Sequence, residues 1–281
     1  NLLEYDAVNK ILIKKKILAP RLISQNYKNN YIEIEDFGDL TVFKKFQKKS
    51  INKKIYYKKI INLLISIKNI KTKYQKTFLK TNYKVPDYSL KKLLDESNLF
   101  LDWYLPKYVK RGKSRILKIK FNKIFKKLLN NIYYKNKVFV HRDFHISNLM
   151  ITKKGLGLID SQDAVYGNIA YDLASLIDDV RFKTGIKTKK YIFDEFIKKN
   201  KQLNLKKFKN DFEILSVLRN LKIIGIFTRL SERDKKNKYL KLIPHAWELI
   251  DYRTLNNPIF KDLKYLLSKN FDRKIRKSYE N

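Results

Sequence analysis

Residues 141–148 read His141-Arg142-Asp143-Phe144-His145-Ile146-Ser147-Asn148. The apolar segment 137–140 precedes it and is predicted to be a short strand. Leu149–Thr152 and Gly157–Ile159 follow as two more short strands, and Asp160 comes directly after them. Polar side chains therefore gather on loops at strand ends, where functional groups usually lie.

The spacing of three polar residues in this region is that required for phosphoryl transfer. Such a reaction needs one carboxylate beside the acceptor hydroxyl, and an amide oxygen and a second carboxylate that hold Mg²⁺ against the phosphates. We predict Asp143 as the catalytic base and Asn148 and Asp160 as the metal ligands. Ligands that offer only oxygen suit Mg²⁺, which keeps waters and substrate phosphates in its shell.

On both sides of this region the apolar spacing is mostly helical. We predict helices over residues 3–17, within 43–80, over 89–110, 115–133 and 169–181, and through most of the chain to about 269. The alternating residues 31–35 predict a strand. The expected fold class is therefore α+β, mostly helical, with short β-hairpins at the catalytic loop.

Composition excludes several classes of protein. The 281 residues include 64 Lys+Arg and 27 Asp+Glu, a formal charge of +37, and no Cys, which excludes disulfides and thiolate metal sites. No apolar run approaches the roughly 18 residues of a membrane helix, so we expect no membrane partner. Lys is spread evenly and Arg supplies only 11 of the basic residues. This pattern favours a solvated surface over a nucleic-acid interface. Nucleic-acid binding stays an alternative.

Several motifs together resemble one enzyme family. They are Ile34–Asp39, Leu99–Tyr104, His141–Asn148, Ile159–Ala164 with Gly167, Tyr171–Leu173, Arg219–Leu230, Arg233-Asp234 and Tyr239-Leu240. The chain thereby resembles the aminoglycoside phosphotransferase/choline kinase family, which has a protein-kinase-like fold. The Gln162-Asp163-Ala164 and Gly225–Leu230 segments resemble its bacterial branch of anomeric sugar kinases for N-acetylmuramate and N-acetylglucosamine.

The resemblance implies an ATP- and Mg²⁺-dependent kinase that phosphorylates an alcohol group, the anomeric hydroxyl of an N-acetylated amino sugar, in cell-wall recycling. It implies a cytoplasmic monomer whose partners are ATP and a small sugar. His141 and Arg142 would support the catalytic loop, and Asp172 would anchor it. The alternative for Asp172 is a carboxylate stabilised at a helix N-terminus.

The resemblance also implies binding residues. Glu35, Asp36 and Phe37 would form the hinge beside the nucleotide, and Asp163 and Arg229 would face the sugar. The alternative for the last two is a buried ion pair or a solvated surface. Asp36-Phe37-Gly38 spells the kinase metal motif, but it precedes the catalytic loop, so Asp36 is not predicted as a metal ligand.

The N-terminal region departs from the family pattern. No Gly precedes Gly38. The early lysines lie on the predicted helix 3–17, whereas the family pattern has a Lys on a strand. On this helix, Glu4 is the candidate partner for that strand Lys. We therefore expect a truncated N-terminal β-lobe, with residues 1–40 as its remnant and 41–281 as the helical catalytic lobe, and poor ATP affinity. Alternative functions are an aminoglycoside or choline kinase, a non-catalytic pseudokinase and a basic nucleic-acid-binding protein.

Overall fold

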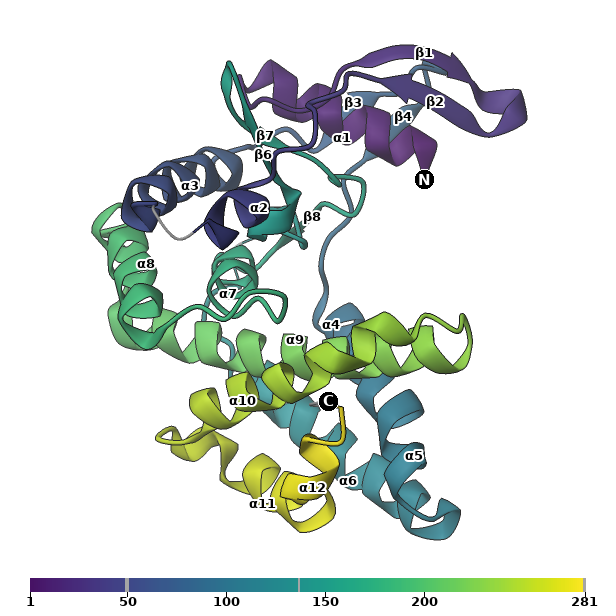
Figure 1. The fold of residues 1–281 in the computed structure, drawn as a ribbon, viewed down its shortest axis with the longest axis vertical. Helices are drawn as coiled ribbons and strands as arrows, with labels where there is room; N and C mark the ends of the chain where they lie inside the picture. Colours follow the sequence, from purple (N-terminus) through teal and green to yellow (C-terminus); the bar gives the residue numbers. More distant parts are fainter. Residues whose placement is uncertain (49–50, 136, 280–281) are drawn as a thin grey trace. The chain divides into compact units, whose positions relative to one another are not determined.

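The computed structural model describes residues 1–48, 51–135 and 137–279, and the chain divides into two compact units (Figure 1). Unit 1 comprises Asn1–Tyr88, Tyr134–Ile177 and Thr184–Leu205, and unit 2 comprises Ser89–Tyr133, Asp178–Lys183 and Lys206–Asn281. The predicted catalytic loop and both predicted metal ligands belong to unit 1. The prediction of domains at 1–40 and 41–281 stays a prediction.

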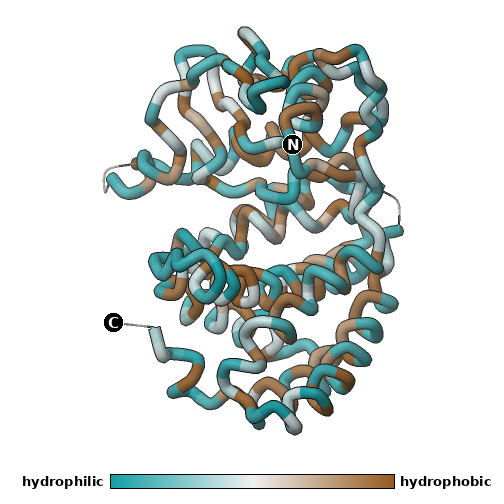
Figure 2. Tube along the Cα trace, turned by 90° about the vertical axis from the view of Figure 1, so that its right-hand side faces the viewer, coloured by the Kyte–Doolittle hydropathy of each residue, from teal (hydrophilic) through white to brown (hydrophobic). Residues whose placement is uncertain are grey.

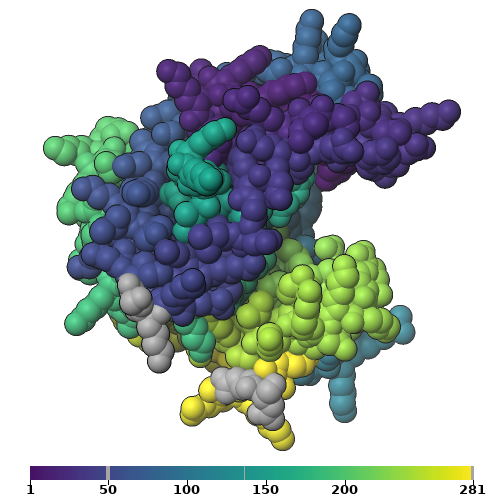
Figure 3. Space-filling view, turned by 45° about the horizontal axis from the view of Figure 1, so that its top comes forward, coloured from purple at the N-terminus to yellow at the C-terminus, as the bar shows by residue number. Residues whose placement is uncertain are grey.

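The N-terminal part of unit 1 combines one helix with two hairpins. Helix α1 (Leu2–Lys14) buries Ala7, Val8, Ile11 and Leu12 at helical spacing, which gives it one apolar face. Strands β1 (Leu22–Asn26) and β2 (Tyr31–Ile34) pair antiparallel, as do β3 (Tyr74–Lys76) and β4 (Asn82–Lys84). In Figure 3 the purple N-terminal residues share one surface with the blue residues near position 80.

Two predicted helical segments end earlier than the sequence pattern indicates. Helix α1 stops at Lys14, and the predicted 43–80 segment splits into α2 (Val42–Gln47), α3 (Lys53–Lys68) and strand β3. Positions 49 and 50 of that segment lie outside the described residues. Strand β3 forms because β4 supplies a backbone ladder, and Lys14 Nζ donates to Gln75 Oε1 over 2.7 Å, which ties the hairpin to α1.

The catalytic region is built on two short antiparallel pairs. Strand β5 (Val138–Val140) pairs with β8 (Val165–Gly167), and β6 (Leu149–Thr152) pairs with β7 (Gly155–Leu158). Strand β8 was not predicted, because three residues carry no periodic signal. Helices α7 (Tyr171–Ile177) and α8 (Ile186–Lys198) complete unit 1.

The regular structure among the described residues of unit 2 is all helical. Its helices are α4 (Leu90–Ser97), α5 (Leu105–Tyr108), α6 (Arg111–Asn130), α9 (Leu205–Glu232), α10 (Ile243–Thr254), α11 (Lys261–Asn270) and α12 (Arg273–Arg276), with a π-helical turn at Phe100–Tyr104. Figure 2 shows brown and teal residues alternating along these helices, as expected for helices with one apolar face. Phe100, Tyr104, Trp247 and Phe271 form an aromatic core.

The predicted α+β class is therefore confirmed. Short strand pairs lie in unit 1, and helices make up most of the remaining regular structure. Within the described ranges, no helix is both long and apolar enough to cross a bilayer.

Candidate active site

One buried carboxylate accepts hydrogen bonds from the start of the predicted catalytic loop. Asp172, in the first turn of α7, accepts hydrogen bonds from the backbone amides of His141 (Oδ2, 2.7 Å) and Arg142 (Oδ1, 3.0 Å). Arg142 adopts φ of 74°, a left-handed conformation that costs energy for a residue with a side chain. The two hydrogen bonds hold this conformation, and Asp172 lies in the first turn of α7 as well; its role as the anchor of a catalytic loop stays a prediction.

The loop closes on itself around the backbone of Asp143. The Asp143 carbonyl accepts from the His145 amide over 3.0 Å and from Asn148 Nδ2 over 3.1 Å. The Asn148 amide in turn donates to the His145 carbonyl over 2.9 Å. These bonds hold Asp143 and Asn148 at a constant separation, with Asp143 half-buried and Asn148 buried.

Asn148 and Asp160 lie just beyond the two ends of one hairpin. Leu149 pairs with Leu158 at the open end of β6–β7, and the Ile159 amide donates to the Asn148 carbonyl over 3.1 Å. Asp160 follows with φ of 65°, which turns the chain away from the strand direction. The hairpin thus brings two residues that are twelve positions apart to adjacent positions at one edge.

The donor atoms at this edge fit a divalent cation that prefers oxygen. A carbonyl can only accept, so Asn148 Nδ2 must face Asp143, and Oδ1 points the other way without a hydrogen bond among the described residues. Asp160 Oδ1 accepts a hydrogen bond from Gln162 Nε2 over 3.2 Å, which leaves Oδ2 for a metal ion. In the described part of the chain, no group of three or more His, Cys, Asp or Glu side chains is placed to hold a metal ion. The remaining ligands of a Mg²⁺ here would be water and substrate oxygens.

His141 links the catalytic loop to the Asp160 loop. Its ring is fully buried, and Nε2 lies 3.1 Å from the Ile159 carbonyl, which can only accept, so Nε2 carries the proton. Burial lowers the pKa of His141, and the carboxylates of Asp143 and Asp160 oppose that shift. The imidazole is therefore a neutral structural brace that joins the two loops.

The predicted sugar-facing residues lie in different units. Asp163 contacts Arg142 through its carbonyl (3.3 Å) and Oδ1 (3.4 Å), and the Arg142 guanidinium stacks over the Tyr88 ring at 5.2 Å. Asp163 thus contacts Arg142 of the predicted catalytic loop, and its role toward a sugar stays a prediction. Arg229 lies on α9 in unit 2, and its role toward a sugar stays a prediction.

The predicted hinge packs on the β6–β7 hairpin. The Glu35 amide donates to the Arg21 carbonyl over 2.8 Å, and Asp36 Oδ1 accepts from the Gly38 amide over 2.7 Å in a tight turn. Phe37 lies so close to Gly157 that a Cβ there would be 2.6 Å from its ring. The hinge therefore sits against the hairpin that carries Asn148 and Asp160, and its contact with a nucleotide stays a prediction.

Two residues of α1 join the site without a signal in the sequence. The Ser161 hydroxyl hydrogen-bonds Asn9, which also donates to the Pro20 carbonyl over 3.0 Å. Burial raises the pKa of the Tyr5 hydroxyl, and the nearby Asp160 carboxylate raises it further. Both residues look like ordinary helix positions in the sequence, because their partners lie about 150 residues away. Glu4 lies 3.8 Å from the N-terminal amine.

Comparisons with known proteins show which family the chain resembles. Residues 80–197 match the family described as Phosphotransferase enzyme family, and the predicted family resemblance is confirmed. The protein-kinase-like fold is also confirmed by solved structures. A choline/ethanolamine kinase family protein from Mesorhizobium loti has a TM-score of 0.61 at 9% identity, covering 93% of this chain and 81% of that one. Plasmodium vivax ethanolamine kinase has a TM-score of 0.58 at 13% identity, covering 90% and 72%.

Comparison with curated proteins gives relatives with a more specific name. The chain is similar to an N-acetylmuramate/N-acetylglucosamine kinase of Neisseria meningitidis serogroup B, with 36% identity over 169 residues. That alignment covers 57% of this chain and spans half the length of the relative. A Pseudomonas aeruginosa kinase of the same name is 24% identical over 256 residues, covering 89% of this chain and 72% of the relative.

Proposed function

We propose that this protein is an ATP-dependent kinase of N-acetylated amino sugars that transfers the γ-phosphate to the anomeric hydroxyl. One observation carries the proposal: a single hairpin sets Asn148 and Asp160 side by side, directly after the loop that holds Asp143. Two relatives that carry the name N-acetylmuramate/N-acetylglucosamine kinase support the choice of sugar. A cytoplasmic monomer that acts in cell-wall recycling stays the prediction.

Asp143 acts on the acceptor in this proposal. Its carboxylate orients the sugar hydroxyl and accepts its proton as the bond to phosphorus forms, while its backbone is fixed by His145 and Asn148. Asn148 Oδ1 and Asp160 Oδ2 would hold Mg²⁺, which when bound neutralises charge on the phosphate oxygens. Asp172 and His141 hydrogen-bond the backbones of the two loops that carry these residues, and so hold the loops in place.

The test begins with the wild-type protein, MgATP and a panel of acceptors. N-Acetylmuramate, N-acetylglucosamine, choline and kanamycin are each incubated with the enzyme, and phosphorus NMR detects the product. We expect a sugar 1-phosphate from the first two acceptors alone. Phosphorylation of choline or kanamycin with neither sugar turned over would replace this proposal with the alternative substrate class.

Variants then assign the residues. Asp143→Asn should lower kcat by about 10²–10⁴-fold, the usual contribution of a positioned base. Asp160→Asn should raise the Mg²⁺ concentration that gives half the maximal rate. Asp194→Asn is the matched control, because Asp194 lies on α8 of the same unit and pairs only with Lys190 at 3.4 Å in the described contacts. Full turnover by Asp143→Asn would remove Asp143 from the role of base.

A further inference from the structure

Helix α6 carries the largest net positive charge of the described helices. Its 20 residues, Arg111–Asn130, include eight Lys or Arg and no Asp or Glu, a net charge of +8. The longer helix α9 of the same unit has six basic and three acidic residues, a net charge of +3. Positive charge is therefore concentrated on α6 beyond the general excess of lysine in this chain.

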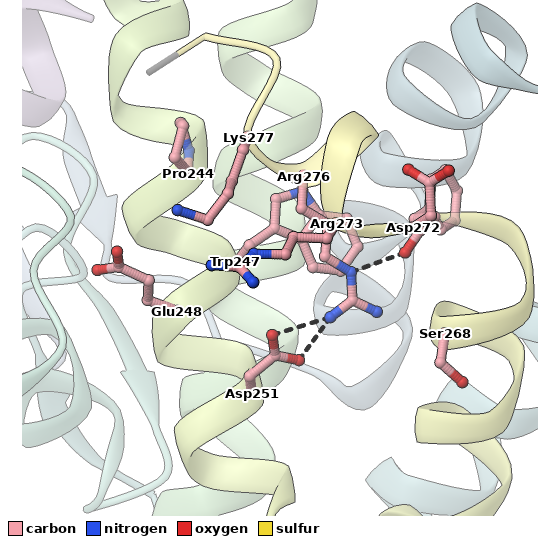
Figure 4. A pocket seen from close by; sticks show the side chains of 10 residues that line it. Pro244, Trp247, Glu248, Asp251, Ser268, Asp272, Arg273, Arg276 and Lys277 are labelled. Carbon is pink, nitrogen blue, oxygen red and sulfur yellow. Dashed lines mark hydrogen bonds and ion pairs between the residues drawn. The ribbon is translucent and has the colours of Figure 1, made fainter.

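Most of the cations on α6 have no counter-charge. Lys118 pairs with Asp102 at 2.9 Å, and Lys127 pairs with Asp262 at 3.0 Å. The other six make no ion pair or side-chain hydrogen bond in the described contacts: Arg111, Lys113, Arg115, Lys120, Lys123 and Lys126. Arg276 of the same unit shows the opposite arrangement, since it binds both oxygens of Asp251 at 2.7 and 2.8 Å (Figure 4).

Helix α6 buries one face and leaves two isoleucines exposed on the other. Phe121 and Phe125 are fully buried, whereas Ile116 is 57% and Ile119 is 69% exposed. Ile116, Ile119 and Lys123 are three and four positions apart, so they share one helix face. Beside it lies a hollow of about 470 Å³ that is lined by Lys118, Ile119, Asn122, Lys123 and Lys126. The exposed side of α6 therefore sets apolar side chains among unpaired cations.

An anionic lipid surface has the chemistry that complements this face. Its phosphates attract Lys and Arg, and the boundary with the acyl chains just below them receives exposed apolar side chains. A nucleic acid fits less well, because single strands stack their bases on aromatic side chains and both Phe side chains of α6 are buried. Arg, the preferred cation for bidentate phosphate contacts, supplies only two of the six unpaired cations.

We infer that the exposed face of α6 docks on an anionic lipid membrane. The lysines of this face lie at the headgroup phosphates, and Ile116 and Ile119 enter the layer just below them. The opposite face of the helix stays in the protein core, so this contact is peripheral and needs no spanning helix. Such a location goes beyond the proposed kinase activity, because no residue of the candidate active site determines it.

The first test is cosedimentation of the 281-residue chain with lipid vesicles in the absence of substrates. Vesicles of phosphatidylcholine with about one-third phosphatidylglycerol are compared with phosphatidylcholine alone, and we expect binding to the anionic vesicles only. The combined variant Lys120→Gln, Lys123→Gln and Lys126→Gln should weaken this binding about 10–100-fold, because each Lys near an anionic surface contributes about fivefold. Gln retains the helix propensity of Lys, so α6 should still form.

A matched variant controls for the overall charge of the protein. Lys206→Gln, Lys236→Gln and Lys241→Gln together remove the same charge from exposed positions of unit 2 outside α6. Because these lysines act only at long range, which salt at about 0.1 M screens beyond about 10 Å, binding should weaken less than about threefold. Equal losses in the two combined variants would show that adsorption depends on net charge alone, and would overturn the inference.

A label at position 119 tests whether the isoleucine face enters the lipid. The chain has no Cys, so Ile119→Cys takes a single environment-sensitive fluorophore. Its emission should shift to shorter wavelength on anionic vesicles, since the label leaves water at the acyl boundary. The same label on Lys241→Cys should keep its emission. An unchanged emission at position 119 would show that this face stays in water, and would overturn the inference.

Two further outcomes would assign the face differently. Equal binding to phosphatidylcholine alone would show that anionic lipid is not recognised. A loss of duplex DNA binding in the α6 variant, with vesicle binding unchanged, would make the face a nucleic-acid surface. Either result would overturn the inference. None of these measurements involves phosphoryl transfer, so a failure of the proposed kinase activity is detected separately.

Discussion

Asp172 and His141 are 31 positions apart in the sequence, yet the Asp172 carboxylate accepts the His141 backbone amide over 2.7 Å. The same carboxylate takes the next amide, that of Arg142. These hydrogen bonds join the start of α7 to the start of the catalytic loop. They thereby help to set the direction of the Asp143 side chain.

This relationship predicts a large kinetic effect from a small chemical change. In Asp172→Asn only one oxygen can accept, and the NH₂ group meets a backbone amide, so one loop hydrogen bond is lost. We expect kcat to fall about 100-fold, typical of a misplaced reacting group, with a stability loss of about 1–3 kcal/mol. Asp211→Asn is the control, because Asp211 accepts the Tyr133 amide at 2.8 Å in unit 2. A similar fall in kcat for the control would mean that destabilisation alone explains the effect.

The burial of His141 predicts a pH dependence of folding. Its pKa in the folded state lies below the ordinary value of 6.5, because burial disfavours the charged ring. As the pH falls below about 6.5 the unfolded chain takes up a proton that the folded chain does not, so the free energy of unfolding decreases, by up to about 1.4 kcal/mol per pH unit. Above pH 7 this group contributes no slope. Urea denaturation from pH 5 to 8 should show a smaller acid slope for His141→Asn, and identical slopes would contradict the prediction.

Gly225 is required by a close approach of two backbones. A Cβ at this position of α9 would lie 2.3 Å from the Leu99 carbonyl carbon and 2.4 Å from its oxygen. Backbone cannot move aside cheaply, so Gly225→Ala should cost at least about 1–3 kcal/mol of stability. Gly112→Ala in α6 meets nothing within 4 Å and should instead stabilise by about 0.5–1 kcal/mol. Denaturant midpoints of the two variants that shift in the same direction would refute this.

Gly157 offers a test of the hinge. A Cβ there would meet the Phe37 ring at 2.6 and 2.7 Å, but a ring can swing away, so the fold should survive in Gly157→Ala. If the hinge at Glu35–Phe37 lies beside the nucleotide, displacing Phe37 should weaken ATP binding about three- to tenfold, or about 1 kcal/mol. Gly185→Ala, where nothing lies within 4 Å, is the control. Unchanged ATP affinity in Gly157→Ala, measured by calorimetry, would separate the hinge from the nucleotide.

Features that depend on local spacing could be predicted from the sequence alone. The motif at His141–Asn148 with Asp160 sets the class, and short apolar strands around a turn place Asn148 and Asp160 at one hairpin edge. Helical periodicity located α3, α6 and α9, because each must bury one face. The family resemblance followed from the same motifs.

Which distant groups meet depends on the three-dimensional fold. Strands β3, β4 and β8 form because a partner strand supplies their backbone hydrogen bonds. The sequence of a three-residue strand does not indicate which segment will pair with it. The contact of Asn9 with Ser161 likewise joins residues from distant parts of the chain. Local sequence fixes what a side chain can do, whereas burial and pairing depend on the whole fold and decide what it does.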